Sequence, residues 1–139
     1  MGKKTRLETV YRLRETEEDR ARQAMANAQR HVAAATDAFS AAKALAVVDE
    51  RREASAAAWS VVEMAHTRAL QEARQAERAV QTAKDGLSQT RNRYLGAHTR
   101  TESLRRAIEA RRAETVRAER QAERKDMDEI AMLLRTAMA

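Results

Sequence analysis

Residues 69–83, ALQEARQAERAVQTA, carry the pattern that decides the fold. Small apolar residues recur there at alternating spacings of four and three, while Arg, Glu and Gln fill the positions between them. The members of this stripe are Ala69, Ala73, Ala76, Val80 and Ala83. Such spacing puts the apolar residues along one side of a helix, as in the seam of a coiled coil. The stretch therefore predicts a long helix that packs against another helix.

The same stripe extends in both directions, and a second stripe of the same spacing lies nearer the N-terminus. The later stripe consists of Val62, His66, Ala69, Ala73, Ala76, Val80, Ala83, Leu87, Thr90, Tyr94, Ala97, Thr101, Leu104 and Ile108. The earlier stripe consists of Leu7, Tyr11, Arg14, Glu18, Ala21, Met25, Ala28, Val32, Ala35, Phe39, Ala42 and Ala46. The two stripes are out of phase, which predicts a turn between them in the polar segment DERREASA, residues 49–56. Ser55 is the candidate N-cap after the turn.

Composition supports long helices throughout. The chain has 139 residues, no proline and three glycines, so little interrupts a helix. Alanine supplies most of the 43% of hydrophobic residues, and aromatic residues are only 3%. Alanine buries little area, so we expect neither a globular core around a cleft nor high stability.

The sequence predicts an all-α fold, a long antiparallel two-helix coiled-coil hairpin with a longer C-terminal helix. Residues 1–139 form a single domain, with a first helix over about 5–48, a turn over about 49–56 and a second helix over about 57–136. Thr5 and Glu8 fit a capping box at the start of the first helix. A turn at Asp85-Gly86 competes, but the later stripe passes through it without changing phase.

Folding the chain at residues 52–53 gives a register in which the numbers of facing residues sum to about 105. Tyr11 then faces Tyr94, and residues 101–139 overhang the first helix by roughly 55–60 Å if they are helical. The first part of this overhang is rich in Arg and Glu. Its last part is apolar at Met127, Ile130, Ala131, Leu134 and Met138.

Several classes of function are excluded by what the sequence lacks. There is no cysteine, no glycine-rich phosphate loop and no metal-ligand spacing around His31, His66 or His98. We therefore expect no enzyme, no catalytic or metal site and no cofactor. Residues 54–62, the longest nearly apolar stretch, are too short to span a membrane, and no signal peptide is evident. A cytoplasmic protein without a direct membrane span is expected.

The net charge is +6 and the isoelectric point is about 10.3. A basic chain suits a nucleic acid, an anionic membrane or an acidic protein surface. The basic residues are interspersed with 21 acids and lack aromatic neighbours for base stacking, so no nucleic-acid partner is expected. A basic hairpin that binds nucleic acid stays as an alternative, and it predicts strongly salt-dependent binding.

Three surfaces are candidates for partner binding. The first is an arginine series past the paired region, and its alternative is a solvated helix face: Arg105, Arg106, Arg111, Arg112, Arg117, Arg120 and Arg124. The second is the C-terminal apolar patch, whose alternative is self-association or packing back on the hairpin. The third is the hairpin tip, where apolar residues either cap the end or anchor a partner: Phe39, Leu45, Val47, Val48, Trp59, Val61 and Val62.

Two segments resemble the FliJ family, the small coiled-coil protein of the bacterial flagellar type III export apparatus. The first segment has Leu7, Val10 and Leu13-Arg14 at spacings of three, followed by Glu17-Glu18-Asp19. The second is Lys125-Asp126-Met127-Asp128-Glu129-Ile130-Ala131, similar to a K-x-M-D-E/D-x-A element near the end of such proteins. Together they cover about twenty residues, and this chain has more alanine than the family pattern.

The resemblance implies a central stalk that links the hexameric export ATPase to the export gate, a membrane protein with a cytoplasmic domain, and that also escorts export chaperones. Such a protein is cytoplasmic and peripherally associated with the inner-membrane export apparatus. The resemblance assigns to the ATPase end Leu7, Val10, Leu13, Arg14, Glu17, Met127, Asp128, Glu129, Ile130 and Ala131. Arg105, Arg111, Arg112 and Arg117 of the overhang are added as candidates for charge-assisted bonds to ring carboxylates. The candidate gate contacts at the tip are Phe39, Leu45, Val48, Trp59 and Val62.

Two other readings stay open. One is the equivalent stalk of a type III secretion injectisome, the YscO family, which has the same shape. The other is a self-associating structural coiled coil, in which the overhang pairs with another chain.

Overall fold

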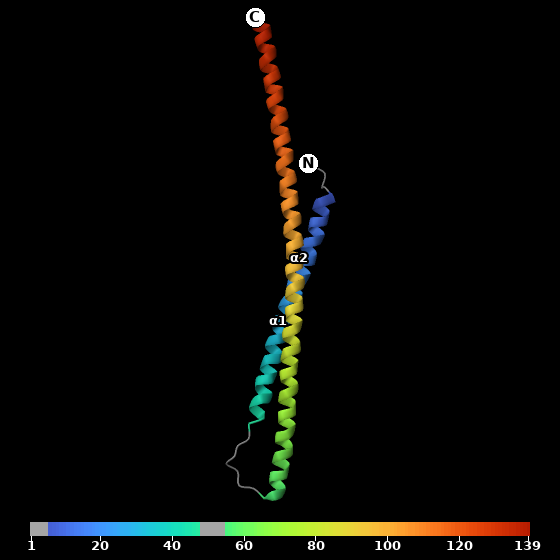
Figure 1. The fold of residues 1–139 in the computed structure, drawn as a ribbon, viewed down its shortest axis with the longest axis vertical. Coiled ribbons are helices and arrows are strands. Elements are labelled where there is room, and N and C mark those ends of the chain that lie inside the picture. Colours follow the sequence, from blue (N-terminus) through green and yellow to red (C-terminus); the bar gives the residue numbers. More distant parts are fainter. Residues whose placement is uncertain (1–5, 48–54) are drawn as a thin grey trace. The chain divides into compact units, whose positions relative to one another are not determined.

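The computed structural model describes residues 6–47 and 55–139. These residues form two long helices, α1 (Arg6–Leu45) and α2 (Ala56–Met138), and no strand occurs in these two ranges (Figure 1). The prediction of an all-α helical hairpin is confirmed. Thr5, Val48 and most of the expected turn at 49–56 lie outside the described residues. Ser55 is the N-cap of α2, because its Oγ accepts a hydrogen bond from the Ala58 N–H at 3.4 Å.

The chain divides into two compact units, and α2 contributes to both. The end unit contains the described residues up to Thr16 together with His98–Ala139. The hairpin unit contains Glu17–Ala97. In Figure 1 the end unit is the blue start of α1 with the orange and red part of α2.

Both predicted stripes lie where the two helices touch. Every residue of the stripe from Leu7 to Ala46 and of the stripe from Val62 to Ile108 is buried or half-buried. Most side chains of both stripes are only half-buried, because alanine is small and covers little area. Ala83, at 5% exposure, is the most deeply buried apolar residue among those described. Glu18 and Thr101, both polar, are the other two buried residues.

The predicted register is wrong by about three helical turns. In the end unit the Thr101 hydroxyl donates to the Arg14 carbonyl at 3.3 Å, although the predicted register placed Arg91 there. In the hairpin unit the Arg22 guanidinium lies over the Tyr94 ring, although the predicted register placed Ala83 opposite Arg22. Stripe residues recur at spacings of three and four, so three such steps cover ten or eleven residues. Sliding one helix by that amount again places the stripe of one helix against the stripe of the other. The alanine pattern alone therefore did not determine the register.

The overhang begins later than predicted. Thr101 is 4% exposed, and Leu104 and Ile108 are half-buried, so these residues belong to the paired stretch. From Glu109 onward every residue of α2 is exposed. We call residues 109–138 the free end of α2.

Candidate functional site

The start of α1 and the adjoining part of α2 form the region that the sequence singled out as the ATPase end. Arg112 Nη2 lies 2.9 Å from Glu8 Oε1, and this ion pair joins the first turn of α1 to α2. Glu8 was expected to cap α1 together with Thr5. Thr5 lies outside the described residues, and the Glu8 carboxylate contacts a residue 104 positions away in the chain.

An open groove of about 500 Å³ lies where α1 begins beside α2, and we call it the end groove. Its lining residues are Leu7, Glu8, Ile108, Arg111, Arg112, Thr115, Val116 and Glu119. Leu7, Ile108 and Val116 give it an apolar part, and its charged lining consists of two glutamates and two arginines. Such a site suits an apolar side chain from a partner helix whose flanks carry charge.

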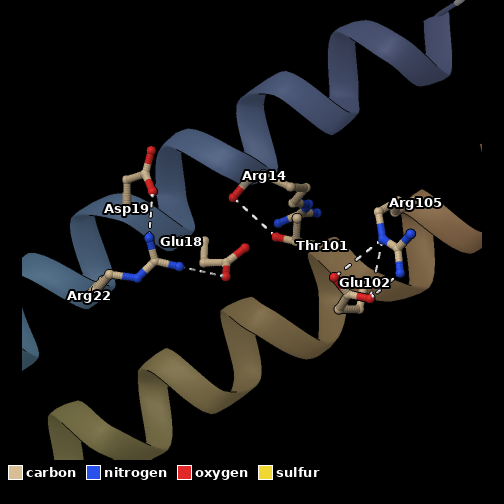
Figure 2. Close-up of polar contacts among 7 residues, drawn as sticks. All are labelled: Arg14, Glu18, Asp19, Arg22, Thr101, Glu102 and Arg105. Atoms are coloured by element: carbon tan, nitrogen blue, oxygen red, sulfur yellow. Dashed lines mark hydrogen bonds and ion pairs between the residues drawn. The ribbon is translucent and has the colours of Figure 1, made fainter.

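Figure 2 shows a set of polar contacts among seven residues of α1 and α2. In the end unit Arg105 binds Glu102 Oε2 at 2.8 Å and Glu109 Oε1 at 2.7 Å. The hydrogen bond from Arg105 holds the pKa of Glu102 below its ordinary value and raises the pKa of Arg105. Because both carboxylate partners lie on α2 itself, Arg105 is already engaged within its own helix.

Tyr11 belongs to the same unit and lies near these charges. A hydrogen bond with Glu15 raises the pKa of the Tyr11 phenol, and partial burial adds to this effect. Glu102 raises the pKa of Tyr11 further, while Arg105 lowers it. The phenol therefore stays protonated, and it serves as a seam residue with a polar tip.

In the hairpin unit Glu18 and Arg22 form a polar layer within the seam. Arg22 Nη2 lies 3.3 Å from Glu18 Oε1, and Arg22 Nη1 lies 3.4 Å from Asp19 Oδ1 (Figure 2). The Arg22 guanidinium also lies over the Tyr94 ring, 5.7 Å from its centroid, in a cation–π contact. The pKa of Arg22 is raised, first by hydrogen bonding to Tyr94. The charged layer thus has partners on both helices.

The remaining predicted residues of the ATPase end fall into two groups. Val10 and Leu13 are exposed on α1, while Arg14 and Glu17 are half-buried. The second group lies on the free end, where all its members are exposed: Arg117, Met127, Asp128, Glu129, Ile130 and Ala131. The structure therefore brings Leu7, Arg111 and Arg112 together at the end groove, and it places the motif around Met127 farther along α2.

The predicted tip residues differ in exposure. Leu45 is 76% exposed and Trp59 is 38% exposed, whereas Phe39 and Val62 are half-buried in the seam. Val47, Val61 and Met64 are further large apolar side chains that this part of the hairpin unit exposes. Val48 lies outside the described residues.

Sequence reasoning missed the contacts that cross between the helices. The Thr101 hydroxyl, the Glu8–Arg112 pair and the Arg22–Tyr94 contact all require the correct register. The signal that was available was the presence of Arg14, Glu18 and Thr101 within otherwise apolar stripes. Polar seam residues often specify register.

Other kinds of site were sought in the described ranges. No group of three or more His, Asp or Glu side chains in 6–47 and 55–139 is placed to hold a metal ion. Neither described helix has a segment both long and apolar enough to cross a membrane.

A family model described as "Flagellar FliJ protein" matches residues 3–136, nearly the whole chain. Neither the curated proteins nor the solved structures include a significant match. The chain therefore belongs to the FliJ family and is a component of the flagellar export apparatus. The family consists of structural and export components and is not known for enzymes.

Proposed function

We propose that the chain is the central stalk of the export apparatus, and that its end unit docks into the hexameric export ATPase. The observation that carries this proposal is the free end of α2, which is helical yet exposed from Glu109 onward and is rich in arginine. A long helix whose side chains are exposed on every face is expected to be held by a partner. Arginine makes strong charge-assisted hydrogen bonds to carboxylates, which suits an acidic pore.

The contacts of the arginines divide them into engaged and available residues. Arg105 is bound to Glu102 and Glu109, and Arg112 is bound to Glu8. Arg111 lines the end groove, and Arg117 is exposed one turn and a half farther along α2. Arg111 and Arg117 are therefore our candidates for binding an ATPase carboxylate.

The part of the hairpin unit near the connection between α1 and α2 is the proposed contact for the export gate. Leu45, Trp59 and Val61 expose apolar area near the connection between α1 and α2. A tryptophan within such a patch is a common energetic anchor of protein interfaces. The same patch is the proposed binding place for unloaded export chaperones, and through the gate the protein associates peripherally with the inner membrane.

A stalk of this kind acts through its asymmetry. One rod inside a six-fold ring meets the six subunits in different orientations, so it favours different conformations in different subunits. A contact must differ between conformations in order to shift their populations. The exposed arginines of the free end provide charged side chains for such a contact.

The test is ATPase binding and stimulation by a triple variant, Arg111→Ala, Arg112→Ala and Arg117→Ala. We expect weaker binding and weaker stimulation with unchanged helical content by circular dichroism. The matched control replaces Arg68, Arg74 and Arg78 by Ala, which removes three exposed arginines from the part of α2 in the hairpin unit. Equal losses in the two triple variants, or no loss in either, would remove the arginines of the end unit from the mechanism.

The gate contact is tested separately with Trp59→Ala. We expect this variant to bind the cytoplasmic domain of the gate protein at least about tenfold more weakly, as is usual for a central aromatic anchor. Its binding to the ATPase should be unchanged. A variant that loses both interactions together would indicate damage to the hairpin and not the loss of a specific contact.

A further inference from the structure

Larger and smaller side chains alternate along the seam of the hairpin unit, and the larger ones recur every seven residues on both helices. The larger residues are Met25, Val32 and Phe39 on α1 and Val80, Leu87 and Tyr94 on α2. The smaller residues between or beside them are Ala21, Ala28 and Ala35 on α1 and Ala76, Ala83 and Thr90 on α2. All twelve are buried or half-buried. Close packing requires each larger side chain to face a smaller one.

The observed register meets this requirement. The hydrogen bond from Thr101 to Arg14 and the contact of Arg22 with Tyr94 set a register in which the numbers of facing residues sum to about 115. Each larger residue of α1 then faces a smaller residue of α2: Met25 faces Thr90, Val32 faces Ala83 and Phe39 faces Ala76. Each larger residue of α2 faces an alanine in the same way: Tyr94 faces Ala21, Leu87 faces Ala28 and Val80 faces Ala35.

A slide of one heptad preserves this match, whereas a slide of half a heptad destroys it. After a slide of seven residues, the larger residues of α1 again meet alanines, namely Ala83, Ala76 and Ala69. After three or four residues, Met25 meets Leu87 and Val32 meets Val80, while alanines meet alanines. The seam therefore allows two well-packed registers about 10 Å apart, with a poorly packed one between them.

The connection between the helices allows the slide in one direction. In the hairpin unit Leu45 falls opposite about residue 70, so Ala56 lies roughly 21 Å farther along the axis (Figure 1). Moving α1 by seven residues toward the start of α2 shortens this span to roughly 10 Å. The opposite slide lengthens it to roughly 32 Å, close to the limit of about 33–36 Å for ten fully extended residues. The second register is therefore the one shifted toward the start of α2.

We propose that α1 slides by one heptad along α2, and that the two registers couple the end groove to the hairpin tip. The end groove takes Leu7 and Glu8 from α1 and its other lining residues from α2, so it exists only in the observed register. In the shifted register Leu7 leaves Ile108 and faces Thr101. A partner that binds the end groove therefore holds α1 in the observed register.

The same slide changes the surroundings of the tip residues. The end of α1 moves two turns nearer to Trp59, and Ala46 comes to lie opposite Val62. A partner that binds the tip thus meets a different surface in each register. Because each partner favours one register, binding at one end changes the affinity at the other.

The contacts between the helices favour the observed register but oppose the slide weakly. The slide breaks the hydrogen bond from Thr101 to Arg14. It also separates Glu8 from Arg112, but Arg105, one heptad earlier, comes to lie opposite Glu8. Alanine buries little area, so few apolar contacts are lost while the helices move. The shifted register is thus a minor state whose population a partner raises.

The first test uses the absence of cysteine from the chain and joins Ala28→Cys on α1 to one cysteine on α2. Leu87→Cys reports the observed register, Val80→Cys the shifted register and Ala83→Cys the position halfway between them. A disulfide needs Cα atoms within about 7 Å, so each pair captures one register.

Dilute chain in a glutathione buffer should form intramolecular disulfides in a characteristic order. We expect the highest yield with Leu87→Cys, and a higher yield with Val80→Cys than with the nearer Ala83→Cys. A yield that falls steadily from residue 87 through 83 to 80 would show a single register and overturn the proposal. No disulfide through residue 87 would overturn it as well.

The second test blocks the shifted register by overpacking. Ala69 faces Ala46 in the observed register and Phe39 in the shifted one, so Ala69→Leu opposes two large side chains only after the slide. It should lower the yield of the Val80→Cys disulfide at least about fivefold and leave the Leu87→Cys disulfide unchanged.

The matched control for this test is Ala73→Leu. Residue 73 faces an alanine in both registers, first Ala42 and then Ala35. The control should therefore leave both disulfides unchanged. Equal effects of the two leucine variants on the Val80→Cys disulfide would overturn the proposal.

The third test concerns the coupling, which rests on the proposed function, whereas the slide is measured with the chain alone. The chain locked by oxidation through residue 80 should bind the hexameric export ATPase at least about tenfold more weakly than the chain locked through residue 87. The reduced forms of the two should bind alike. Equal binding by the two locked forms would overturn the coupling. Loss of binding in every form, reduced or oxidised, would instead contradict the proposed stalk.

Discussion

Two stretches of α2 are equally helical but are stabilised differently. Residues 62–108 bury a stripe of mostly small residues against α1, whereas residues 109–138 are exposed throughout. The exposed stretch also carries large apolar side chains, which α1 does not bury: Val116, Met127, Ile130, Met132, Leu133, Leu134 and Met138. The hairpin thus uses alanine where its own helices touch and leaves large apolar area on the free end.

This difference separates internal stability from partner binding. An alanine seam contributes little hydrophobic free energy per residue, so hydrogen bonds and helix propensity matter more than in an ordinary coiled coil. The free end contributes still less to stability, and its substitution should affect partners more than folding. The following variants test that separation, beginning with the largest expected effect.

Ala83→Asp should be the most damaging substitution. Ala83 is the most buried apolar residue among those described, and an aspartate there would place an unpaired charge between the helices. We expect a loss of about 3 kcal/mol or more in the free energy of unfolding, measured by urea denaturation and circular dichroism. The same change at exposed Ala118 should cost less than about 0.5 kcal/mol. Similar losses at the two positions would contradict the contrast between the stretches.

Gly86→Ala should stabilise the chain. Gly86 lies inside α2 with an ordinary helical backbone, and a Cβ added there meets no atom within 4 Å. Alanine should therefore raise the free energy of unfolding by about 0.5–1 kcal/mol. Gly96→Ala should act alike, since its surroundings are equally open. A loss of stability in either variant would show that the helices approach more closely at that glycine than the structure indicates.

Thr101→Val should cost about 1 kcal/mol, because it removes the hydroxyl that donates to the Arg14 carbonyl while keeping the β-branched shape. The control is Thr136→Val on the free end, where the hydroxyl bonds only to the Met132 carbonyl of its own helix. The measurement is again urea denaturation. If Thr101→Val is as mild as its control, the register that pairs Thr101 with Arg14 is incorrect.

The smallest expected effect is a pH dependence from Glu102. Its pKa is lowered by Arg105, so the carboxylate form is stabilised in the folded chain. This contribution is present above the ordinary glutamate pKa of about 4.3 and is lost as the pH falls below it. Glu102 is solvent-accessible, so the loss should be small. The measurement compares the acid unfolding of Glu102→Gln with that of the unaltered chain. If the unaltered chain gains stability on acidification, the predicted direction of the pH dependence is wrong.

The sequence predicted which residues lie in the seam, because the 3–4 spacing is a local property of each helix. Both stripes are buried or half-buried along their whole length. Register is not local. Ala73 and Ala76 fit against one alanine of α1 as well as against another three turns away. The contacts that choose between these registers join Thr101 to Arg14 and Tyr94 to Arg22. The wrong register also placed the start of the overhang at Thr101 instead of Glu109.

The candidate site was predictable in part for the same reason. The exposed arginines and the C-terminal apolar residues could be named, because they fall outside the stripes. The end groove could not, since it depends on where α1 begins relative to α2. Leu7 was assigned to the ATPase end from its motif, but its position beside Ile108 and Val116 follows only from the structure.

Hydrogen–deuterium exchange of the chain, alone and with the hexameric export ATPase, tests the central claim most directly. In the chain alone, residues 109–138 should exchange faster than residues 62–97, because every residue of the free end is exposed. Addition of the ATPase should slow exchange in 109–138 and leave 62–97 unchanged. Exchange in 109–138 that the ATPase does not alter would contradict the account.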